Sequence, residues 1–585
     1  MSPGQPQGPL RELEDAVRAA AAVVRARASG GEPSAVASVP PSALPRLERS
    51  RREGQGDYST NAAMLLAPVL GESPRAIAER IGSELAAVLG GDLERAEVAG
   101  PGFLNLVVSD AWHRRALAAV LAAGERFGAG AAGGAPGAGR AGDTDGAVPA
   151  ERILIEFVSA NPTGPLVAAS GRHAAYGDAL ARVLEHHGHS VWREYYFNDA
   201  GSQIRLLGES VRARARGGEV PEGGYKGDYV ARLAAALPGA AEAAADGVER
   251  LAAGAVELLL GQIKATLARY GVRFDAFFSE RTLHDGSPSA LDRALAGLER
   301  DGHLYHSEGA TWLRTTSFGD DKDRVVVRSS GEPTYLAADI AYLQDKRERG
   351  FERQLMPVGA DHHAYVRELK AAIAALGGDP GTVEVPILQF VHLVQGGEVF
   401  AMSKRRGDFV TLDELLDEIG VDATRFFMLQ RSHDRTLELD IELARRQSAE
   451  NPVYYVQYAH ARIASMLGRL PAERVAAAVT ADRDPRSGDA AWGSGSLHRS
   501  ERELVKKLAA LPEEIAEAAA RRAPHRIAAY ALELAQEFTA FYRDCRVLGA
   551  TPEPVESFRI ALSVAARRVI ALSLGLLGVS APESM

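Results

Sequence analysis

Hydrophobic and polar positions follow two different periods along the chain, and the period changes from one region to the next. Residues 10–27 and 76–89 carry apolar side chains at every third or fourth position, which predicts amphipathic helices. Residues 96–110 alternate instead and are interrupted by a Pro-Gly pair, which predicts a strand and a turn. Together these elements predict a small α+β domain over residues 1–127.

The composition changes after this first domain. Residues 128–150 consist mainly of small residues, which bury too little surface to order themselves, and they predict a linker. An apolar, β-rich run at 151–160 then leads through a turn with prolines and glycine into a helix-like segment and a second strand at 190–199. This order is typical of the βαβ unit of a parallel, Rossmann-type sheet, which binds ligands beyond the carboxyl ends of its strands.

The rest of the chain divides into a helical insertion, a resumed sheet and a helical end. Residues from about 204 to 270 are rich in alanine and predict helices. Long amphipathic helices predict a bundle over 441–585. The expected fold class is therefore α/β and multidomain, with a Rossmann-type domain over 151–440 between the small α+β domain and the helical bundle. The parallel sheet is expected to resume in three apolar runs, at 324–343, 352–363 and 385–396.

Composition narrows the class of protein without naming a function. The 585 residues predict two to four domains, and the single cysteine, Cys545, excludes an intrachain disulfide and any multi-cysteine zinc site. The N-terminus lacks the pattern of a signal peptide, and the apolar C-terminal run is cut by Arg567 and Arg568. We therefore expect no membrane span and a cytoplasmic location. A net charge of −10 still leaves room for a local basic face that binds nucleic acid.

The sequence EFVSANPTGPLVAASGR, at 156–172, follows the first predicted strand of the parallel sheet. It resembles the ATP-binding segment of class I aminoacyl-tRNA synthetases in its arginyl form. Two positions that hold histidine in that family are Val167 and Ser170 here, and the glycine between them is Ala169. The resemblance implies ATP contacts for Pro162, Gly164, Ser170 and Gly171.

The missing histidines must be replaced by other donors if the phosphates of ATP are to be held. We expect the Ser170 hydroxyl, unpaired N–H groups at the start of the following helix, and the imidazole of His173 to act as these catalytic donors. The alternative is that His173 merely faces solvent on that helix.

A second motif, AMSKRRGDF, lies within residues 396–429. It resembles the mobile Lys-Met-Ser-Lys loop of the same class, with Ala401 in place of the first lysine. The resemblance implies that Met402, Ser403 and Lys404 contact ATP, and that Lys404 offsets negative charge on the pyrophosphate leaving group. An isolated match would more often be a solvated basic turn, but its order after the first motif favours the catalytic loop.

Residues 331–377 resemble the arginyl family over nearly their whole length. The resemblance implies that Tyr335 and Asp339 contact the substrate arginine, that Glu280 supplies a second carboxylate, and that Asn161 holds the α-amino group. This assignment agrees with the chemistry, because a guanidinium is a planar, permanently charged fork that a carboxylate matches.

Two adjacent histidines occur in VGADHHAY, within the same block. Side chains that are neighbours on an extended segment point apart, so a zinc site is not expected, nor any other protein-bound metal. We expect His362 to contact ATP and His363 to contact arginine, while Asp199 and Gln203 support the pocket.

The two ends of the chain resemble the tRNA-binding domains of the family. Near the N-terminus, the resemblance makes Tyr58, Asn61 and Asn105 candidate tRNA contacts. Near the C-terminus, Tyr454, Tyr458 and Arg462 are candidates, because aromatic faces stack unpaired bases and arginines meet phosphates. A packed core explains the same spacing of aromatic residues equally well.

The resemblance implies an arginine-tRNA ligase of class I. Such an enzyme forms arginyl-adenylate from L-arginine and ATP with Mg2+, and then transfers the arginyl group to the 3′ end of tRNA(Arg). We expect a monomer. Two alternatives stay open: an inactive, synthetase-like RNA-binding or regulatory protein, because both histidines are replaced, and a class I ligase for another amino acid.

Overall fold

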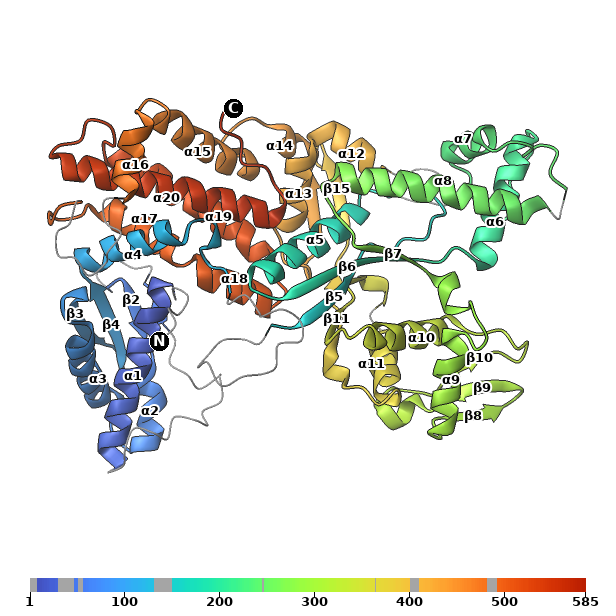
Figure 1. Cartoon of the computed structure of the whole chain (residues 1–585), viewed down its shortest axis with the longest axis horizontal. Coiled ribbons are helices and arrows are strands. Elements are labelled where there is room, and N and C mark those ends of the chain that lie inside the picture. Colours follow the sequence, from blue (N-terminus) through green and yellow to red (C-terminus); the bar gives the residue numbers. More distant parts are fainter. Residues whose placement is uncertain are drawn as a thin grey trace.

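A computed structural model describes residues 8–29, 47–50, 56–130, 150–244, 247–362, 365–399, 410–480 and 492–585. The molecule is elongated: a small N-terminal domain and a helical bundle occupy one end, the parallel sheet lies near the middle, and further helices extend to the other end (Figure 1). Most of the predicted linker, residues 131–149, lies outside the described residues. The domain boundaries at 127, 150 and 440 therefore remain predictions.

The N-terminal domain packs helices against a four-stranded antiparallel sheet. The helices predicted at 10–27 and 76–89 are confirmed as α1 (Pro9–Ser29) and α3 (Pro74–Leu89). The predicted strand and turn are also confirmed, as two strands with a turn at Gly102. This residue has a φ of +141°, and a Cβ added to it would lie 2.4 Å from Pro74 Cβ, so the turn leaves no room for a side chain. The sheet order is β1-β2-β4-β3, with β1 (Leu47–Arg49), β2 (Tyr58–Thr60), β3 (Leu93–Ala99) and β4 (Phe103–Val108), and α2 (Ala62–Leu70) and α4 (Asp110–Ala123) complete the domain.

The predicted βαβ unit is confirmed as β5 (Arg152–Glu156), α5 (Ser170–His186) and β6 (Ser190–Phe197), with β5 and β6 parallel. The helix approaches the sheet closely at Gly177, where a Cβ would lie 2.2 Å from the ring of Phe157. The full sheet has the order β13-β11-β5-β6-β7. The strands that follow β5 in the chain are placed first on one side of it, as β6 and β7, and later on the other, as β11 and β13, so β5 lies at the topological switch point of the sheet. The other strands are β7 (Ala276–Ser279), β11 (Arg353–Leu355) and β13 (Val383–Glu384), all parallel to their neighbours.

The prediction that the parallel sheet resumes in three runs was wrong for two of them. Only the run at 352–363 contributes a strand, β11, to that sheet. The run at 324–343 forms β10 and a helix, and β10 joins an antiparallel sheet, because it pairs with the hairpin that precedes it. The run at 385–396 joins two further small sheets. The strands concerned are β8 (Leu304–Ser307), β9 (Ala310–Leu313), β10 (Arg324–Val327), β12 (Val358–Gly359), β14 (Ile387–Leu388), β15 (Val391–Gln395), β16 (Glu398–Val399) and β17 (Leu437–Asp440).

The helical insertion expected at about 204–270 corresponds to α6 (Gly201–Ala215), α7 (Asp228–Ala236) and α8 (Val248–Arg269). These helices enclose an apolar core of their own, and they extend to the end of the molecule opposite the N-terminal domain (Figure 1). The remaining helices around the sheets are α9 (Ala290–Arg300), η6 (Glu280–Leu283), α10 (Tyr335–Glu348), η8 (Ala360–His362), α11 (Tyr365–Ala375), α12 (Leu412–Ile419) and α13 (Val421–Leu429).

The C-terminal region is helical, as predicted, and α20 (Glu553–Leu577) runs through its centre. The described helices α8 and α20 are long and apolar enough to cross a membrane by length and composition. The apolar stretch of α20 is 72% buried inside the protein, as in the core helix of a bundle. The other helices are α14 (Ile441–Arg445), α15 (Pro452–Leu467), α16 (Ala472–Thr480), α17 (Arg499–Ala509), α18 (Leu511–Ala520) and α19 (His525–Asp544).

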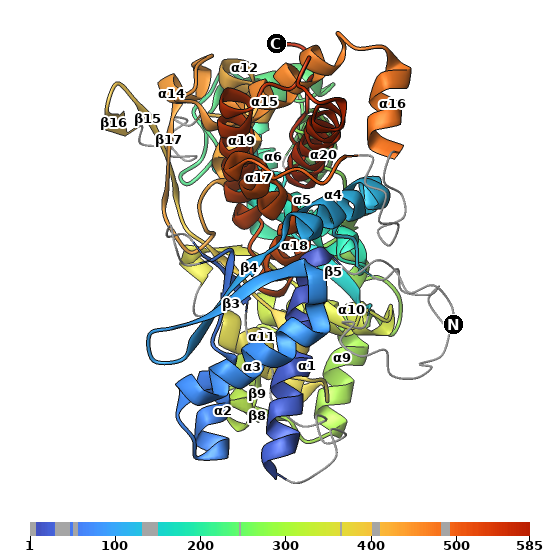
Figure 2. The same ribbon diagram turned by 90° about the vertical axis from the view of Figure 1, so that its left-hand side faces the viewer.

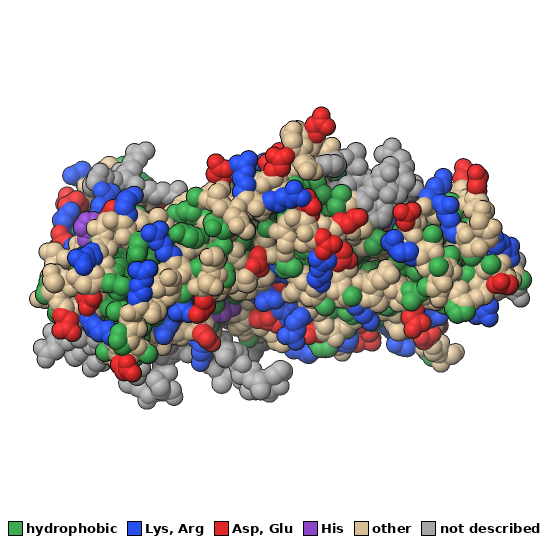
Figure 3. Space-filling view, turned by 90° about the horizontal axis from the view of Figure 1, so that it is seen from above, with side chains coloured by type: hydrophobic (Ala, Val, Ile, Leu, Met, Phe, Trp, Pro, Cys, Tyr) green, Lys and Arg blue, Asp and Glu red, His purple; other side chains and the backbone are tan. Residues whose placement is uncertain are grey.

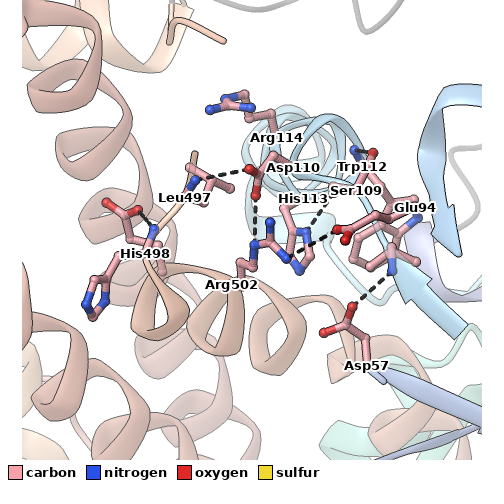
Figure 4. A network of polar contacts seen from close by, with 12 residues as sticks. Asp57, Glu94, Ser109, Asp110, Trp112, His113, Arg114, Leu497, His498 and Arg502 are labelled. Atoms are coloured by element: carbon pink, nitrogen blue, oxygen red, sulfur yellow. Dashed lines mark hydrogen bonds and ion pairs between the residues drawn. The ribbon is translucent and has the colours of Figure 1, made fainter. Parts of the chain in front are cut away.

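Ion pairs join the N-terminal domain to the helical bundle, where α4 lies beside α17 (Figure 2). Lys506, only 2% exposed, lies 2.8 Å from both Asp57 Oδ1 and Glu503 Oε1. Arg502 donates through Nε to Asp110 Oδ1 at 2.8 Å, and Asp110 also accepts from a backbone N–H of the bundle (Figure 4). Separating the two domains would leave these charges without their partners, so the contacts favour the observed arrangement.

Candidate active site and RNA-facing surfaces

The segment at 156–172, called the ATP-binding segment here after the motif that it resembles, begins with a strained turn directly after β5. Val158 and Ser159 have φ values of 68° and 38°, which residues other than glycine seldom adopt. Two contacts from β6 hold this turn: Tyr195 donates its hydroxyl to Ala160 O at 2.7 Å, and the Tyr196 N–H donates to Ser159 Oγ at 3.2 Å. Strain of this kind persists only where the surroundings fix it, and it is concentrated at functional sites.

The second half of the segment forms backbone hydrogen bonds with the residues that follow the AMSKRRGDF motif. Ala168 N donates to Val410 O at 2.9 Å, and Leu412 N donates to Leu166 O at 2.8 Å. The ATP-binding segment and the return of the loop therefore form one backbone ladder. The loop residues Met402, Ser403 and Lys404 lie outside the described residues, as does His363.

The expectation of unpaired N–H groups at the start of α5 was wrong for its first three residues. Ser170, Gly171 and Arg172 donate their N–H groups to the carbonyls three positions earlier, at 2.8, 3.0 and 3.1 Å. The chain enters the helix through a tight turn, and this turn supplies the acceptors that a free helix end would lack. The hydroxyl of Ser170, which is partly exposed, is the group that stays a candidate donor.

Gly171 is buried and serves the packing of this turn. A Cβ there would lie 2.9 Å from Leu412 Cδ1, and Tyr270 donates its hydroxyl to Gly171 O at 3.2 Å. Gly164 and Pro162 are buried too, and Tyr229 from the insertion donates its hydroxyl to Thr163 O at 2.8 Å. Any contact of these residues with ATP would therefore be made by the backbone that they shape.

His173 is partly buried and belongs to the same neighbourhood as His362. Burial lowers the pKa of His173 to about 4, the charges of Arg172 and His362 lower it further, and Asp361 and the carbonyl of Pro357 oppose them. The ring is therefore neutral at physiological pH and carries a single N–H, which the carbonyl of Pro357 accepts in this conformation. The alternative that His173 merely faces solvent is wrong, whereas His362 keeps a side chain that is 59% exposed.

A cluster of acidic side chains, Asp339, Glu280 and Glu156, lies where β5, β6, α10 and α11 meet, and we call this cluster the acidic pocket. Asp339, one turn into α10, accepts a hydrogen bond from the Tyr365 hydroxyl, and Glu280 accepts one from the Tyr196 hydroxyl at 2.5 Å. Burial raises the pKa of Asp339 to about 7; the charges of Glu156 and Glu280 add to the rise, while Tyr365 and Lys346 oppose it. A cation that entered this pocket would restore the ionised form of Asp339.

The other predicted arginine contacts lie at the edges of this pocket. Tyr335 is the first residue of α10 and is 64% exposed. Asn161 donates through Nδ2 to Gln203 Oε1 at 3.2 Å and accepts from Asn198 N at 3.2 Å, so it is held beside the strained turn.

Sequence reasoning missed four residues of the acidic pocket: Glu156, Tyr196, Lys346 and Tyr365. Lys346 is fully buried, and its Nζ lies 2.7 Å from Glu156 Oε2. Glu156 ends the first strand of the sheet directly before the ATP-binding segment, and this position was a usable signal. Tyr365 and Lys346 lie within the block at 331–377, and Tyr196 lies in the second strand of the βαβ unit. None of the three stands out there, because their partners come from elements that only the tertiary structure brings together.

Comparison with known proteins decides the family. A model of the arginyl-tRNA synthetase N-terminal domain matches residues 12–108, a model of the class I (R) tRNA synthetase catalytic domain matches 251–464, and a model of the DALR anticodon-binding domain matches 456–585. An arginine-tRNA ligase of Frankia alni is 44% identical over 553 residues, which cover 92% of this chain and 94% of that protein. This chain belongs to the arginyl-tRNA synthetase family.

Solved structures agree with the family. A putative arginyl-tRNA synthetase from Campylobacter jejuni has a TM-score of 0.71 at 32% identity, and the match covers 82% of this chain and 100% of that one. The arginyl-tRNA synthetase of Thermus thermophilus has a TM-score of 0.70 at 23% identity over 98% of this chain and 100% of that one, which shows the shared fold. The variant segment at 156–172 lies outside the residues that the family models match.

Two of the three N-terminal candidates for tRNA contact are buried. Tyr58 is 1% exposed and packs edge-on against Trp112, with ring centroids 5.9 Å apart. Asn105, in β4, is 7% exposed. Direct tRNA contact by these two side chains is therefore wrong for this conformation. Tyr58 pairs with Leu106 and Asn105 pairs with Ser59, so the two side chains lie on opposite faces of a sheet that is buried on both sides of β4. Asn61, at the N-terminal cap of α2, stays partly exposed.

The C-terminal candidates form an exposed stripe on α15. The rings of Tyr454 and Tyr458 stack with centroids 6.1 Å apart and planes at 11°, and Tyr458 is 45% exposed. The Arg462 guanidinium lies 6.0 Å from the Tyr458 ring and 4.5 Å from the ring of Tyr542. A packed core therefore does not explain Tyr458. The face shown in Figure 3 mixes acidic and basic side chains, so any RNA contact there rests on local groups.

Proposed function

We propose that this chain is an arginine-tRNA ligase that uses ATP. The carboxylate of L-arginine attacks the α-phosphorus of ATP, which forms arginyl-adenylate and releases pyrophosphate; a ribose hydroxyl at the 3′ end of tRNA(Arg) then takes the arginyl group. Membership of the arginyl-tRNA synthetase family over 92% of the chain supports this activity. The observation that carries the choice of amino acid is the pocket that holds Asp339 and Glu280 beside the ATP-binding segment.

Arginine would bind with its guanidinium between Asp339 and Glu280. Asn161 would hold the α-amino group, and Tyr335 would close over the side chain from the start of α10 after a local rearrangement. His363 is a further proposed contact. The negative charge of the pocket supports this assignment, because an ionised carboxylate is the partner that a guanidinium fork matches best.

ATP would lie along the segment from Pro162 to Gly171, with Lys404 and the loop around it closing over the β- and γ-phosphates. Ser170 and His173 are the proposed donors in place of the two missing histidines; to reach a phosphate, the N–H of the neutral His173 would leave the carbonyl of Pro357, and His362 would also contact the nucleotide. No general base is required for adenylation, because the attacking carboxylate is already ionised, so catalysis rests on positioning and charge stabilisation.

Magnesium would enter with ATP and screen its phosphates. Among the described residues, no group of three or more histidine, cysteine, aspartate or glutamate side chains has the arrangement of a metal site. We propose that the ion is held mainly through the nucleotide, that the enzyme acts as a monomer, and that it works in the cytoplasm, where charged tRNA is used.

The direct test is arginine-dependent exchange of pyrophosphate into ATP, measured with and without tRNA(Arg). We expect exchange with arginine and tRNA present and none with lysine. An inactive RNA-binding protein would bind tRNA and give no exchange with any amino acid, whereas a ligase for another amino acid would give exchange only with that one.

The stripe on α15 predicts a separate effect on tRNA. Replacing Tyr458 by alanine should weaken tRNA(Arg) binding about tenfold, because stacking of one base contributes roughly 1–3 kcal/mol. Tyr458→Phe is the matched control: it keeps the ring and should keep the affinity. Filter binding at fixed salt measures both, and equal affinity of all three proteins would remove Tyr458 from the RNA surface.

A further inference from the structure

Each carboxylate of the acidic pocket accepts a hydrogen bond from a tyrosine on a different element. Tyr365, the first residue of α11, donates to Asp339 Oδ2 on α10, and Tyr196, in β6, donates to Glu280 Oε2 in η6. Burial is the main cause that raises the pKa of both phenols well above the usual range of tyrosine. Both hydroxyls therefore stay protonated and act as fixed donors.

Fixed carboxylates matter more for a guanidinium than for an ammonium. The guanidinium presents its N–H groups in one plane with a set spacing, so two partners must keep their orientation to engage it. The ammonium of lysine is a point charge with rotatable donors, and it tolerates a carboxylate that turns. A donor that stops the rotation of each carboxylate therefore favours arginine over lysine.

We propose that Tyr365 and Tyr196 are positioning residues that set the specificity for arginine, each by holding one pocket carboxylate in the orientation that a guanidinium requires. The inference rests on the proposed function, since it takes Asp339 and Glu280 as the partners of the substrate. Neither tyrosine needs to touch arginine itself.

The charges that face Asp339 make the hydroxyl of Tyr365 important for a second reason. Asp339 is faced by Glu156 from β5, Glu280 from η6, Lys346 from its own helix and Tyr365 from α11. Lys346 is already paired with Glu156 at 2.7 Å. Without the Tyr365 hydroxyl, two acidic neighbours and one shared cation remain, and the proton on Asp339 is held more tightly. Arginine would then bind in a higher pH range.

A purely structural role for these tyrosines would rest on their rings. The Tyr196 ring stacks on Phe278 at 6.2 Å and packs on Tyr342 at 4.8 Å. Replacement by phenylalanine keeps this packing and removes only the hydroxyl. The chain also offers a matched control, because the Tyr342 hydroxyl donates to Glu194 Oε1 at 2.6 Å. Glu194 is fully buried and paired with Arg349, outside the arginine pocket.

The experiment compares Tyr365→Phe, Tyr196→Phe and Tyr342→Phe in the full-length enzyme with tRNA(Arg) bound. In pyrophosphate exchange, each of the first two should raise KM for arginine about tenfold, the loss expected for one hydrogen bond to a charged group. Each should also lower the preference for arginine over lysine about tenfold, while kcat and KM for ATP stay within about twofold. Tyr365→Phe should additionally shift the pH midpoint of kcat/KM for arginine upward. Tyr342→Phe should change none of these.

The outcomes separate this inference from the proposed function. If wild-type enzyme shows no arginine-dependent exchange, the proposed function fails first. If wild-type enzyme is active and both pocket variants match Tyr342→Phe in KM, preference and pH midpoint, the positioning role is overturned. Arginine binding by calorimetry gives the same comparison without turnover, and thermal unfolding identifies a variant that fails to fold, in which case the other pocket variant decides.

Discussion

Asp339→Asn is expected to lower kcat/KM for arginine about a thousandfold, because removing one partner of a buried charge pair costs roughly 2–5 kcal/mol. Asparagine keeps the size of the side chain and can accept the hydrogen bond of Tyr365, so the loss would come from charge. Pyrophosphate exchange over a range of arginine concentrations measures it. Asp345→Asn makes the same change six residues along the same helix, next to Arg349 instead of the pocket, and should keep full activity.

The same variant should be more stable than the wild type at alkaline pH. The folded-state pKa of Asp339 is about 7, above its ordinary value of 3.8, so the wild type loses stability as the pH rises through this interval. Asparagine has no such loss. Because Asp339 keeps some contact with solvent, we expect a gain of about 2 kcal/mol at pH 8 and none below pH 4. Urea unfolding at both pH values tests this; equal curves at pH 8 would mean that burial does not penalise the carboxylate.

Arg425→Leu is expected to destabilise the protein by about 3–5 kcal/mol, because Asp178 loses its fully buried partner and keeps only the partly exposed Arg182, while two buried carbonyls lose their donor. Arg425 is fully buried on α13 and forms an ion pair with Asp178 of α5, itself 1% exposed. It also donates to Leu577 O at 2.9 Å and Tyr270 O at 3.0 Å. This one side chain therefore joins the ATP-site helix, the end of the insertion and the last helix of the bundle. Thermal and urea unfolding should both show the loss.

Arg182→Leu is the control for that substitution. Arg182 donates to the same carboxylate, Asp178 Oδ2, at 2.8 Å, but its side chain is 32% exposed. We expect a cost of at most about 1 kcal/mol, as for other exposed pairs. Changing Asp178 to asparagine in the Arg425→Leu background should recover part of the loss. No recovery would place the cost in the lost backbone contacts instead of the unpaired charge.

Much of the fold could be predicted from local patterns. The helices at 10–27 and 76–89, the βαβ unit around the ATP-binding segment, and the helical end all follow from periodicity within one segment. The strands at 324–327 and 391–395 were recognised as strands but assigned to the wrong sheet. A strand pattern specifies which faces are apolar, whereas the pairing partner depends on which other strand lies nearest in the folded chain.

The residues of the candidate site could also be predicted only in part. Asp339, Glu280 and Asn161 could be named from motifs, because those motifs are contiguous in sequence. Tyr365 and Tyr196 could not, since their hydroxyls reach the carboxylates only after α10, α11 and β6 have packed together. The N–H groups of Ser170 to Arg172 were expected to be unpaired, and the turn before α5 uses them.

The sequence by itself determined the family, the order of the domains and the motifs proposed to hold ATP and arginine, because each of these depends on residues close together along the chain. The tertiary structure alone decided which donors are occupied, that Tyr58 faces a core while Tyr458 faces solvent, and how burial raises the pKa of Asp339 to about 7. The physical reason is that hydrogen bonding, burial and charge interactions depend on distances across the folded protein, between residues that the chain separates widely.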